Sequence, residues 1–485
     1  MAEERYVEDL ADKDDFSQWY LDVIRKAQLA DESPVRGCMI IRPYGYALWE
    51  NMQRLLDDRI KATGHQNAYF PLFIPESFLK KEAEHVEGFA PEVAWVTRGG
   101  GEELAEPLAI RPTSEAIIGY MYAKWVQSYR DLPLLYNQWA NVVRWEKRTR
   151  PFLRTSEFLW QEGHTAHRTE EEAETETLKI LIDVYQDFIE KELAIPVITG
   201  QKSDAERFAG AARTYSLEAM MGDGKALQAG TSHNLGQNFA KGFGIQFQDV
   251  DGERKYAWTT SWGASTRLVG GLIMVHGDEA GLQMPPRVAP IQVIIVPIWR
   301  KEQERQAVAE AVSALETRLR QAGLRIHTDW REETPGFKFN DWELRGVPLR
   351  LEVGPKDVQN HQAVLVRRDS RPRAKEMVAQ EQVALRAQQL LGEIQENLYR
   401  RALEFRKSRT YRAEDFATLE RLMADREHLG FVEAWWCGDG ACEAEIKAKT
   451  QATIRNIPLA QPGGEGACVY CGRPATRWAI FAKAY

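Results

Sequence analysis

The stretch NVVRWEKRTRPFLRTSEFLWQE, residues 141–162, decides the fold class of this chain. Its two ends alternate as β-strands do, and its middle, KRTRPFL, has the composition of a cation-rich hairpin loop. Because strand side chains alternate between faces, we expect Arg144 and Glu146 on one face of the first strand. One face of the second strand would carry a cation, two aromatic rings and a carboxylate: Arg154, Phe158, Trp160 and Glu162.

This hairpin has the residue types of a nucleotide site. A guanidinium group pairs with phosphate oxygens through two hydrogen bonds, so its arginines are candidates for phosphate binding. An aromatic ring such as Phe158 can stack on a base. The competing interpretation is a solvated hairpin with a half-buried aromatic face, and the pattern alone leaves both open. The candidate cations are Arg144, Arg148, Arg150 and Arg154.

The bulk composition is that of a globular protein with several domains. The chain has 485 residues, of which 44% are hydrophobic and 28% charged, and this length predicts about two to four domains. No run of about 18 uncharged apolar residues occurs, and the acidic start lacks the features of a secretory signal, so we expect a cytoplasmic protein. The net charge of −8 disfavours nonspecific nucleic-acid binding but leaves room for a local basic surface.

A second unit is expected beyond residue 287. The prolines of MPPRVAP, residues 284–290, interrupt helix and strand patterns and predict a linker. The run IQVIIVPI predicts a buried strand, a helix follows from Lys301, and the strands RIHTDW, LRLEVG and AVLVRRD alternate with the helix FNDWELRG. Such alternation is typical of a compact α/β domain. A charged helix is then predicted over residues 374–409.

Four of the five cysteines lie close together in the last part of the chain. Two close pairs separated by a long spacer suit a tetrahedral zinc ion held by four thiolates. Since all four ligands come from the protein, such a site would be structural. Two disulfides or a redox pair are the alternatives, and the fifth cysteine, Cys38, is expected to be a small buried hydrophobe. The candidate ligands are Cys437, Cys442, Cys468 and Cys471.

The hairpin resembles motif 2 of class II aminoacyl-tRNA synthetases, in which Arg-x-Glu and Arg-x-x-x-Phe flank a loop. Here these are Arg144-Trp145-Glu146 and the run from Arg154 to Phe158. The resemblance implies that Arg144 binds the α-phosphate of ATP and that Glu146 contacts the adenine side of the nucleotide. It also implies that Arg154 reaches the terminal phosphates and that Phe158 stacks on adenine.

Two further stretches resemble the other motifs of this class. GASTRLVGGLIMVHGDEAGLQMPPRVAP, residues 263–290, is similar to motif 3, whose arginine is Arg267 here and would cover adenine and touch the γ-phosphate. CMIIRPYGYALWENMQRLLDDRI, residues 38–60, is similar to motif 1, with its proline at Pro43. Motif 1 implies a homodimer, although ordinary core packing also explains a helix of this kind.

Three runs, RPTSEAIIGYM, FLWQEGHTAH and AGTSHNLGQNFAKGF, resemble the prolyl-tRNA synthetases. A carboxylate suits the charged secondary ammonium of proline, and aromatic rings can wall its apolar ring. The resemblance implies ATP contacts by Gln228 and Thr231. It implies that proline is bound by Thr113, Glu115, Trp160, Glu162, Phe208, His233 and Ser261.

The implied chemistry needs no protein nucleophile. Proline would attack the α-phosphorus of ATP to give prolyl-adenylate and pyrophosphate, and the 3′ end of tRNA(Pro) would then take the prolyl group and release AMP. Alignment and charge stabilisation would come from Arg144, Arg267 and Mg²⁺. Candidate magnesium contacts are Glu146, Glu157 and Gln228. The short segment between motifs 2 and 3 implies the archaeal/eukaryotic-type form, in which an editing insertion is not expected.

The remaining parts resemble the same family. The α/β unit resembles its anticodon-binding domain, and the cysteine tail its C-terminal zinc domain. In such enzymes the terminal carboxylate, here that of Tyr485, tucks toward the catalytic domain. Candidate RNA contacts, for which a solvated charged face is the alternative, are Lys338, Arg345, Arg350, Glu352 and Lys356.

The expected architecture is α+β and multidomain. It has an antiparallel-sheet catalytic domain over residues 1–287, an α/β anticodon-binding domain over 288–390 and a small α/β zinc domain over 391–485. Two rivals remain. A threonyl enzyme would carry zinc in its catalytic pocket, whereas these cysteines lie beyond the anticodon unit. A paralogue that does not charge tRNA would typically lack motif arginines, whereas Arg144 and Arg267 are present.

Overall fold

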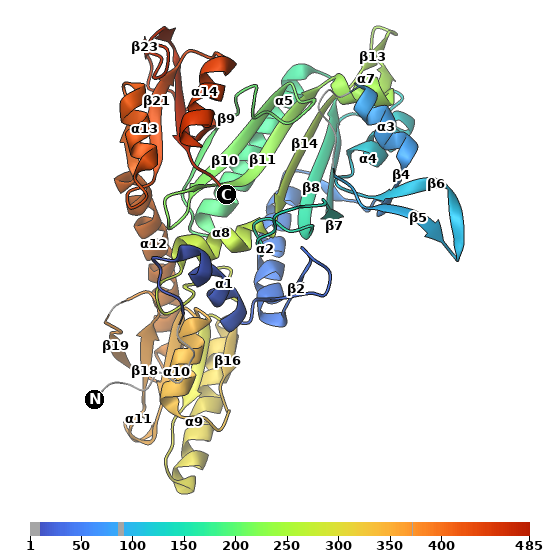
Figure 1. The fold of residues 1–485 in the computed structure, drawn as a ribbon. Helices are drawn as coiled ribbons and strands as arrows, with labels where there is room; N and C mark the ends of the chain where they lie inside the picture. Colours follow the sequence, from blue (N-terminus) through green and yellow to red (C-terminus); the bar gives the residue numbers. More distant parts are fainter. Residues whose placement is uncertain (1–9, 86–91, 371) are drawn as a thin grey trace.

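The computed structural model describes residues 10–85, 92–370 and 372–485 (Figure 1). Part of the acidic start, residues 1–9, lies outside them. The described chain begins with helix α1 (Phe16–Lys26), whose N-cap Asp15 accepts a hydrogen bond from the backbone of Gln18. A short antiparallel pair, β1 (Ala30–Glu32) and β2 (Met39–Ile41), leads into helix α2 (Pro43–Ala62). Pro43 suits the first turn of α2, where no backbone donor is needed.

A large sheet forms the centre of the molecule. Its central strands are, in spatial order, β9 (Val197–Gln201), β10 (Arg213–Met220), β11 (Ala226–Gly236), β14 (Trp258–Ser265), β8 (Glu157–His167) and β7 (Leu134–Val143). All neighbours in this series are antiparallel. The edge strand β3 (Gln66–Asn67) pairs parallel to β7. The expected antiparallel catalytic sheet is thus present.

Helices cover one face of this sheet. A continuous helical segment made of α5 (Glu170–Lys179), the π-helical turn η2 (Ile180–Gln186) and α6 (Asp187–Lys191) packs against β10, β11 and β14. Helix α8 (Arg267–His276) packs against β11 and β14, and α2 packs against η2 and α6. Apolar side chains of these helices, among them Tyr185 of η2, form the main core together with Trp262 of β14. Among the described residues no helix has both the length and the hydropathy needed to cross a bilayer.

A smaller layer lies beside β7 and β8. It contains the sheet β4 (Phe73–Pro75), β6 (Glu102–Ile110) and β5 (Trp95–Gly99), with α3 (Glu76–His85), α4 (Glu115–Trp125), α7 (Asn238–Phe243) and the hairpin of β12 (Gln246–Gln248) and β13 (Arg254–Tyr256). A separate apolar cluster holds these elements together. Figure 1 shows the β5–β6 hairpin projecting from this side. This layer places α4 at one wall of the central sheet.

The α/β unit follows the predicted alternation. Its five-stranded sheet has the order β16 (Ile326–Thr328), β15 (Val293–Pro297), β17 (Leu349–Val353), β18 (Gln362–Arg367) and β19 (Lys375–Ala379), covered by α9 (Glu302–Gln321), α10 (Pro335–Leu344) and α11 (Pro355–Gln359). The segment predicted as a linker is not a free tether, because Met284, Val288 and Ala289 are buried in the main core.

The charged helix was predicted to begin too early. Helix α12 spans Val383–Ser408, and the residues before it form β19, which pairs antiparallel with β18. The short run from Lys375 to Ala379 buries only Val378 among its side chains. Pairing with β18 satisfies the backbone of this run, which favours a strand over an extra helical turn.

The C-terminal part extends the central sheet. It contains β20 (Thr410–Arg412), α13 (Phe416–Ala424), β21 (Phe431–Trp436), α14 (Gly440–Thr450), β22 (Thr453–Pro458), the small pair β23 (Gly466–Ala467) and β24 (Pro474–Ala475), and β25 (Arg477–Ala482). Strand β22 pairs antiparallel with β9 at Ile457 and Pro458. Among the described residues, one sheet of eleven strands therefore runs from β20 to β3. The catalytic part and the C-terminal part of the chain share this sheet.

Candidate active site

The hairpin that decides the fold has a longer loop than predicted. Strand β7 ends at Val143 and β8 begins at Glu157, so Arg144, Glu146 and Arg154 lie in the loop and not on strand faces. The loop turns inward because Phe152 and Leu153 are buried in the main core, with Phe152 at a φ of 60°. Side-chain alternation therefore places residues correctly only from Glu157 onward.

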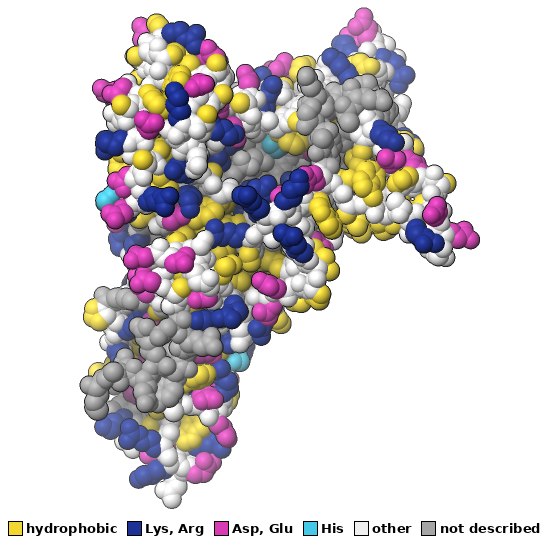
Figure 2. All heavy atoms as spheres, in the orientation of Figure 1, with side chains coloured by type: hydrophobic (Ala, Val, Ile, Leu, Met, Phe, Trp, Pro, Cys, Tyr) yellow, Lys and Arg dark blue, Asp and Glu magenta, His cyan; other side chains and the backbone are white. Residues whose placement is uncertain are grey.

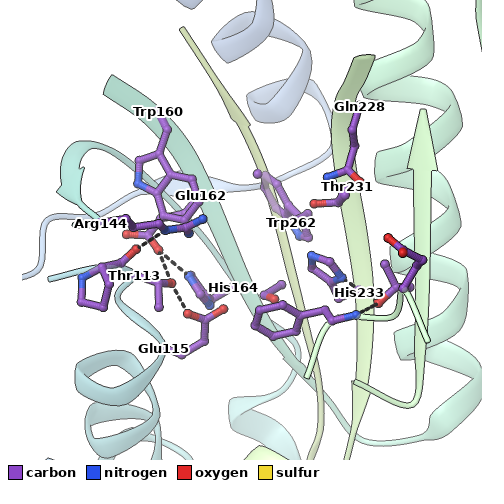
Figure 3. A pocket seen from close by; sticks show the side chains of 16 residues that line it. Thr113, Glu115, Arg144, Trp160, Glu162, His164, Gln228, Thr231, His233 and Trp262 are labelled. Atoms are coloured by element: carbon purple, nitrogen blue, oxygen red, sulfur yellow. Dashed lines mark hydrogen bonds and ion pairs between the residues drawn. The ribbon is translucent and has the colours of Figure 1, made fainter. Parts of the chain in front are cut away.

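A cavity of about 450 Å³ opens on the uncovered face of the central sheet (Figure 3). It is lined by side chains from β8, β10, β11 and β14, and from the loop that begins α4. All seven residues expected to contact proline lie in this lining. They are joined there by three of the residues expected to contact ATP, namely Arg144, Gln228 and Thr231.

A buried carboxylate lies at one end of the cavity. Glu162 accepts hydrogen bonds from the backbone N–H of Ser114 at 3.0 Å, from Gln138 Nε2 at 2.9 Å and from His164 Nε2 at 3.0 Å. Burial opposes its ionisation, but the bonds from His164 and Ser114 outweigh burial and hold the pKa of Glu162 below its usual value. Beside it Thr113 donates to Glu115. This end of the cavity is anionic and suits an ammonium group.

The two histidines of the cavity have opposite protonation preferences. Burial opposes protonation of His164, but its contact with Glu162 and the nearby Glu115 raise its pKa. Burial, with His164 and Arg144 nearby, lowers the pKa of His233 to about 3. His233 is therefore neutral, and its Nδ1 lies 3.0 Å from the hydroxyl of Thr214.

Arg144, in the cavity lining, and Arg267 nearby supply the positive charge of the site. The guanidinium of Arg144 lies 5.5 Å from the ring centroid of Phe158 and 5.2 Å from that of Trp160, and its Nε donates to the carbonyl of Pro112. Burial lowers the pKa of Arg144. Burial and the charge of Arg144 lower the pKa of Arg267 to about 10. Two neighbouring guanidinium groups suit an anionic group such as a phosphate.

A β-bulge brings two polar residues of β11 to the cavity. Glu218 of β10 pairs with Gln228, whereas Leu217 pairs with Gly230, so β11 has one extra residue at this point. Strict alternation would send Gln228 and Thr231, three positions apart, to opposite faces, but both line the cavity. The resemblance had indicated these residues, whereas no period in the sequence indicates the bulge.

Four predicted ATP residues lie outside the cavity lining, namely Glu146, Arg154, Phe158 and Arg267. Glu146 and Arg154 form an ion pair of 2.8 Å in the exposed loop, and the Nε of Arg267 donates to the carbonyl of Leu153. Of the predicted magnesium contacts, Gln228 lines the cavity, whereas Glu157 accepts a hydrogen bond from Asn141.

Several lining residues were missed by sequence reasoning. His164 continues the alternation of Trp160 and Glu162 on β8, so the pattern itself could have found it. Gln138 lies outside the lining but donates to Glu162, its partner on the neighbouring strand, and that register follows from the hairpin only once its loop length is known. The other missed lining residues come from loops and distant strands: Pro112, Glu206, Thr214, Trp262 and Gly263.

The RNA-contact candidates of the α/β unit differ in exposure. Lys338 is buried and donates to the carbonyl of Asp329, and Glu352 is buried against Arg350 and Lys375. The backbone carbonyl of Arg345 accepts a hydrogen bond from Tyr44 of α2. Lys338 and Glu352 thus already have partners inside the unit, and their contact with RNA stays a prediction. Lys356 is exposed.

The four tail cysteines come together, and all five cysteines are free of disulfides. The Sγ atoms of Cys437, Cys442, Cys468 and Cys471 all lie within 4.8 Å of one another, an arrangement that can hold a metal ion. Cys38 is only half-buried, so its prediction as a buried hydrophobe is wrong.

The chain matches three family descriptions. Residues 95–276 match the tRNA synthetase class II core domain (G, H, P, S and T). Residues 292–396 match the anticodon binding domain, and residues 420–485 match the C-terminal domain of prolyl-tRNA synthetase. These matches follow the order in which the catalytic sheet, the α/β unit and the cysteine tail occur.

Whole-chain relatives agree with these matches. The chain is 60% identical to a proline–tRNA ligase of Chloroflexus aggregans over 97% of its own length and 98% of the relative's, and 59% identical to that of Symbiobacterium thermophilum over 97% of each. Its fold matches the crystal structure of prolyl-tRNA synthetase from Cryptosporidium parvum complexed with halofuginone and AMPPNP, with a TM-score of 0.93, 43% identity, and coverage of 98% and 99%. The chain belongs to the prolyl-tRNA synthetases, ligases that join proline to its tRNA.

Proposed function

We propose that the cavity on the central sheet is where this ligase activates proline. Proline lies at the anionic end, beside Glu115 and Glu162, and ATP lies toward Arg144 and Arg267. The observation that carries this assignment is that one cavity is lined by two buried carboxylates, those of Glu115 and Glu162, and by the guanidinium of Arg144. An amino acid and a nucleotide need these opposite charges within reach of each other.

The proposed reaction proceeds by alignment of the two substrates. The carboxylate of proline attacks the α-phosphorus of ATP, pyrophosphate leaves, and the 3′ end of tRNA(Pro) then takes the prolyl group from the adenylate and releases AMP. Arg144 offsets the charge that grows on the α-phosphate during the first step. Its stacking against Phe158 and Trp160 holds the guanidinium in place before ATP arrives.

ATP is proposed to enter as its magnesium complex. Amide and carboxylate oxygens are suitable partners for this hard cation. Gln228, in the lining, and Glu157, at the start of β8, are the proposed contacts. Glu146 is a weaker choice, because its carboxylate is paired with Arg154.

The assignment is tested by comparing Michaelis constants for the two substrates. Replacing Glu162→Gln removes the anion at the proline end, so the KM for proline should rise about tenfold or more while the KM for ATP changes little. Gln228→Ala should show the reverse. Glu174→Gln is a matched control, because Glu174 also accepts hydrogen bonds but lies outside the lining. Equal effects of Glu162→Gln on both constants would contradict the assignment.

We also propose that the four tail cysteines bind a structural zinc ion. With a Zn–S bond of about 2.3 Å, tetrahedral geometry needs sulfurs about 3.8 Å apart. The Sγ of Cys437 lies 3.8 Å from those of Cys442 and Cys471, which fits this requirement. Arg473 Nε donates to Cys471 Sγ at 3.2 Å and lowers the pKa of that thiol to about 6, which favours the thiolate that a metal needs.

Metal analysis of the purified protein tests the zinc proposal. The expected content is one zinc ion per chain, lost in Cys442→Ser and kept in Cys38→Ser, which removes a cysteine outside the cluster. Removal of the metal by a chelator should lower the melting temperature, because the ion joins segments more than twenty residues apart. Zinc content that is unchanged in Cys442→Ser would overturn the proposal.

We propose that two copies of the chain pair through the region of β2 and α2. Ile40 is 52% exposed and Tyr46 is 41% exposed, although both are large and apolar. Figure 2 shows further hydrophobic side chains over the neighbouring β4–β6–β5 sheet, where Phe73 and Trp95 are exposed. Exposed apolar surface of this kind is typical of an interface.

Sedimentation analysis tests this pairing. The wild-type protein should sediment as a dimer, and Ile40→Asp should shift it toward the monomer. Val250→Asp is the control, since Val250 is also exposed but lies in the turn between β12 and β13. A dimer that survives Ile40→Asp as well as it survives Val250→Asp would place the interface elsewhere.

The proposed domains keep the bounds 1–287, 288–390 and 391–485. Each contains its own apolar cluster, and α12 runs across the second boundary as a rigid link. We propose a cytoplasmic location, which agrees with free cysteines and with a role in protein synthesis. The α/β unit is proposed to bind the anticodon of tRNA(Pro), with Lys356 among the exposed cations.

A further inference from the structure

The loop between β9 and β10 brings two residues to the cavity. Residues 202–212 contain no helix or strand, and Glu206 and Phe208 belong to the cavity lining. The backbone N–H of Phe208 donates to the hydroxyl of Thr214, which also contacts His233. The ring of Phe208 lies 4.7 Å from that of His233. The position of this loop therefore sets one wall of the proposed proline pocket.

This loop is attached to the C-terminal domain by three side-chain contacts. Ser203 Oγ donates to Glu443 Oε1 at 2.7 Å, and Lys447 Nζ lies 3.1 Å from the carboxylate of Glu206. Lys202 Nζ donates to the backbone carbonyl of Arg455 at 2.6 Å. Strand β9, from which the loop leaves, pairs with β22 of the same domain. The loop is therefore braced from outside the catalytic domain.

Two of the three contacts come from one face of one helix. Glu443 and Lys447 are four positions apart on α14, so both side chains lie on the same side of the helix. The preceding residue, Cys442, belongs to the cysteine cluster. Figure 1 shows α14 beside β9, at the margin of the catalytic sheet. A displacement of α14 relative to the sheet would thus move the loop.

The two contacts have different strengths. Ser203 and Glu443 are buried, and hydrogen bonds to a buried charged group are strong. Lys447 is 59% exposed, so its pair with Glu206 is screened by water and contributes less. Among the described residues Glu443 Oε2 has no hydrogen-bond partner although it is buried. A carboxylate kept at such a position costs stability, which indicates a role beyond packing.

We propose that Glu443 and Lys447 are positioning residues for proline binding, which hold the loop of residues 202–208 against the cavity. The cysteine cluster fixes the start of α14, and α14 fixes the loop. The C-terminal domain thereby sets the affinity for the amino acid without touching it. This inference rests on the proposed assignment of the cavity to proline.

The test measures the KM for proline and for ATP in proline-dependent ATP–pyrophosphate exchange with the full-length protein. Glu443→Ala should raise the KM for proline about tenfold, and Lys447→Ala about twofold, with the KM for ATP nearly unchanged. Glu443→Gln should rescue the loss, because its amide oxygen still accepts from Ser203. Lys449→Ala is the matched control: Lys449 lies on the same helix with similar exposure but contacts Tyr470 and Glu445.

Hydrogen exchange provides a readout that does not depend on activity. Backbone amides of residues 202–212 should exchange faster in Lys447→Ala and Glu443→Ala than in Lys449→Ala, at unchanged zinc content, and proline should slow this exchange. Wild-type proline KM and wild-type loop exchange in both Glu443→Ala and Lys447→Ala would overturn the inference. A wild-type protein whose exchange reaction does not respond to proline would instead overturn the assignment of the cavity.

Discussion

At the scale of single residues, Glu162 shows how the cavity keeps a charge out of water. Three donors from three different segments surround its carboxylate: Ser114, Gln138 and His164. Such a group is costly to bury alone but stable when every oxygen has a partner. A fixed anion of this kind can bind an ammonium group without first reorganising, which is the advantage of a preformed site.

Gly163 allows Trp262 to lie against β8. A Cβ atom at this position would lie 2.1 Å from the ring of Trp262, and the ring cannot yield because it is buried in the core. We expect Gly163→Ala to lower both the melting temperature and the rate of proline-dependent exchange, with a loss of roughly 1–3 kcal/mol in the free energy of unfolding.

Gly230→Ala is the control for this substitution. Gly230 lies in the same sheet, but an added Cβ would meet only ordinary contacts at 3.4 Å. Thermal unfolding of both variants checks the prediction. A melting temperature of Gly163→Ala that is no lower than that of Gly230→Ala would contradict the close contact between Gly163 and the ring of Trp262.

The side chains that β8 contributes to the cavity could be predicted from the sequence, but those that distant segments contribute could not. Alternation correctly places Trp160 and Glu162 on one face and extends to His164. Glu206 and Phe208 come from a loop without periodicity, so nothing local indicates their position. The resemblance supplied Phe208, whereas Glu206 became visible only through the fold.

At the scale of elements, one ion pair joins the α/β unit to the end of the motif 3 helix. Asp278 lies two residues beyond the end of α8, and Arg368 of the α/β unit donates to its carboxylate at 2.6 and 2.9 Å. Arg368 is nearly completely buried. This contact links the domain proposed to bind the anticodon with the helix that begins at Arg267.

Replacing Arg368→Met should reduce tRNA charging more than ATP–pyrophosphate exchange, because the site itself stays intact while the link between domains is lost. It should also cost about 1–3 kcal/mol of stability, since the half-buried carboxylate of Asp278 loses a charged donor while Gln283 still donates to it. The double variant with Asp278→Asn should recover part of that stability, measured by thermal unfolding. Additive losses in the double variant would show that the two residues are not coupled.

The sequence predicted which segments are helices or strands better than it predicted where each of them begins and ends. The strands and helices of the α/β unit follow the predicted order, because the spacing at which hydrophobic residues repeat differs between a helix and a strand. The strand β19 was missed because its five residues bury only Val378, too few for a period to appear. The inward loop after Val143 depends on the core position of Phe152, which is a tertiary contact.

At the scale of the whole molecule, acid should destabilise the fold through buried neutral histidines. Burial lowers the pKa of His276 to about 4, and its Nε2–H donates to the carbonyl of Leu193 at 2.8 Å. The unfolded chain binds this proton below a pH of about 6.5. The folded chain binds it only near pH 4, so stability is lost as the pH falls between these values.

His276→Gln removes this titration while keeping a donor. We expect the melting temperature of the wild-type protein to fall between pH 7 and pH 5, and the variant to show a shallower fall. The slope should not vanish, because burial lowers the pKa of His167 to about 4 as well. Identical pH slopes for the two proteins would contradict the buried neutral state of His276.

The joined sheet is the largest feature that the sequence did not indicate. Three domains were expected in a row, but β22 pairs with β9, so the C-terminal part adds strands to the catalytic sheet. Contacts between segments more than 200 residues apart, such as that of Arg455 with Glu218, leave no trace in the local sequence pattern. The physical reason is that strand edges pair with whichever strand the chain brings near.

Amino-acid-dependent ATP–pyrophosphate exchange tests the central claim most directly, with the purified wild-type protein and its Arg144→Ala variant offered each standard amino acid in turn. The account predicts that proline drives exchange and that Arg144→Ala lowers kcat/KM by about a hundredfold or more. Exchange driven chiefly by another amino acid, or full activity in Arg144→Ala, would contradict the proposed site, and no exchange with any amino acid would indicate a chain that does not activate proline.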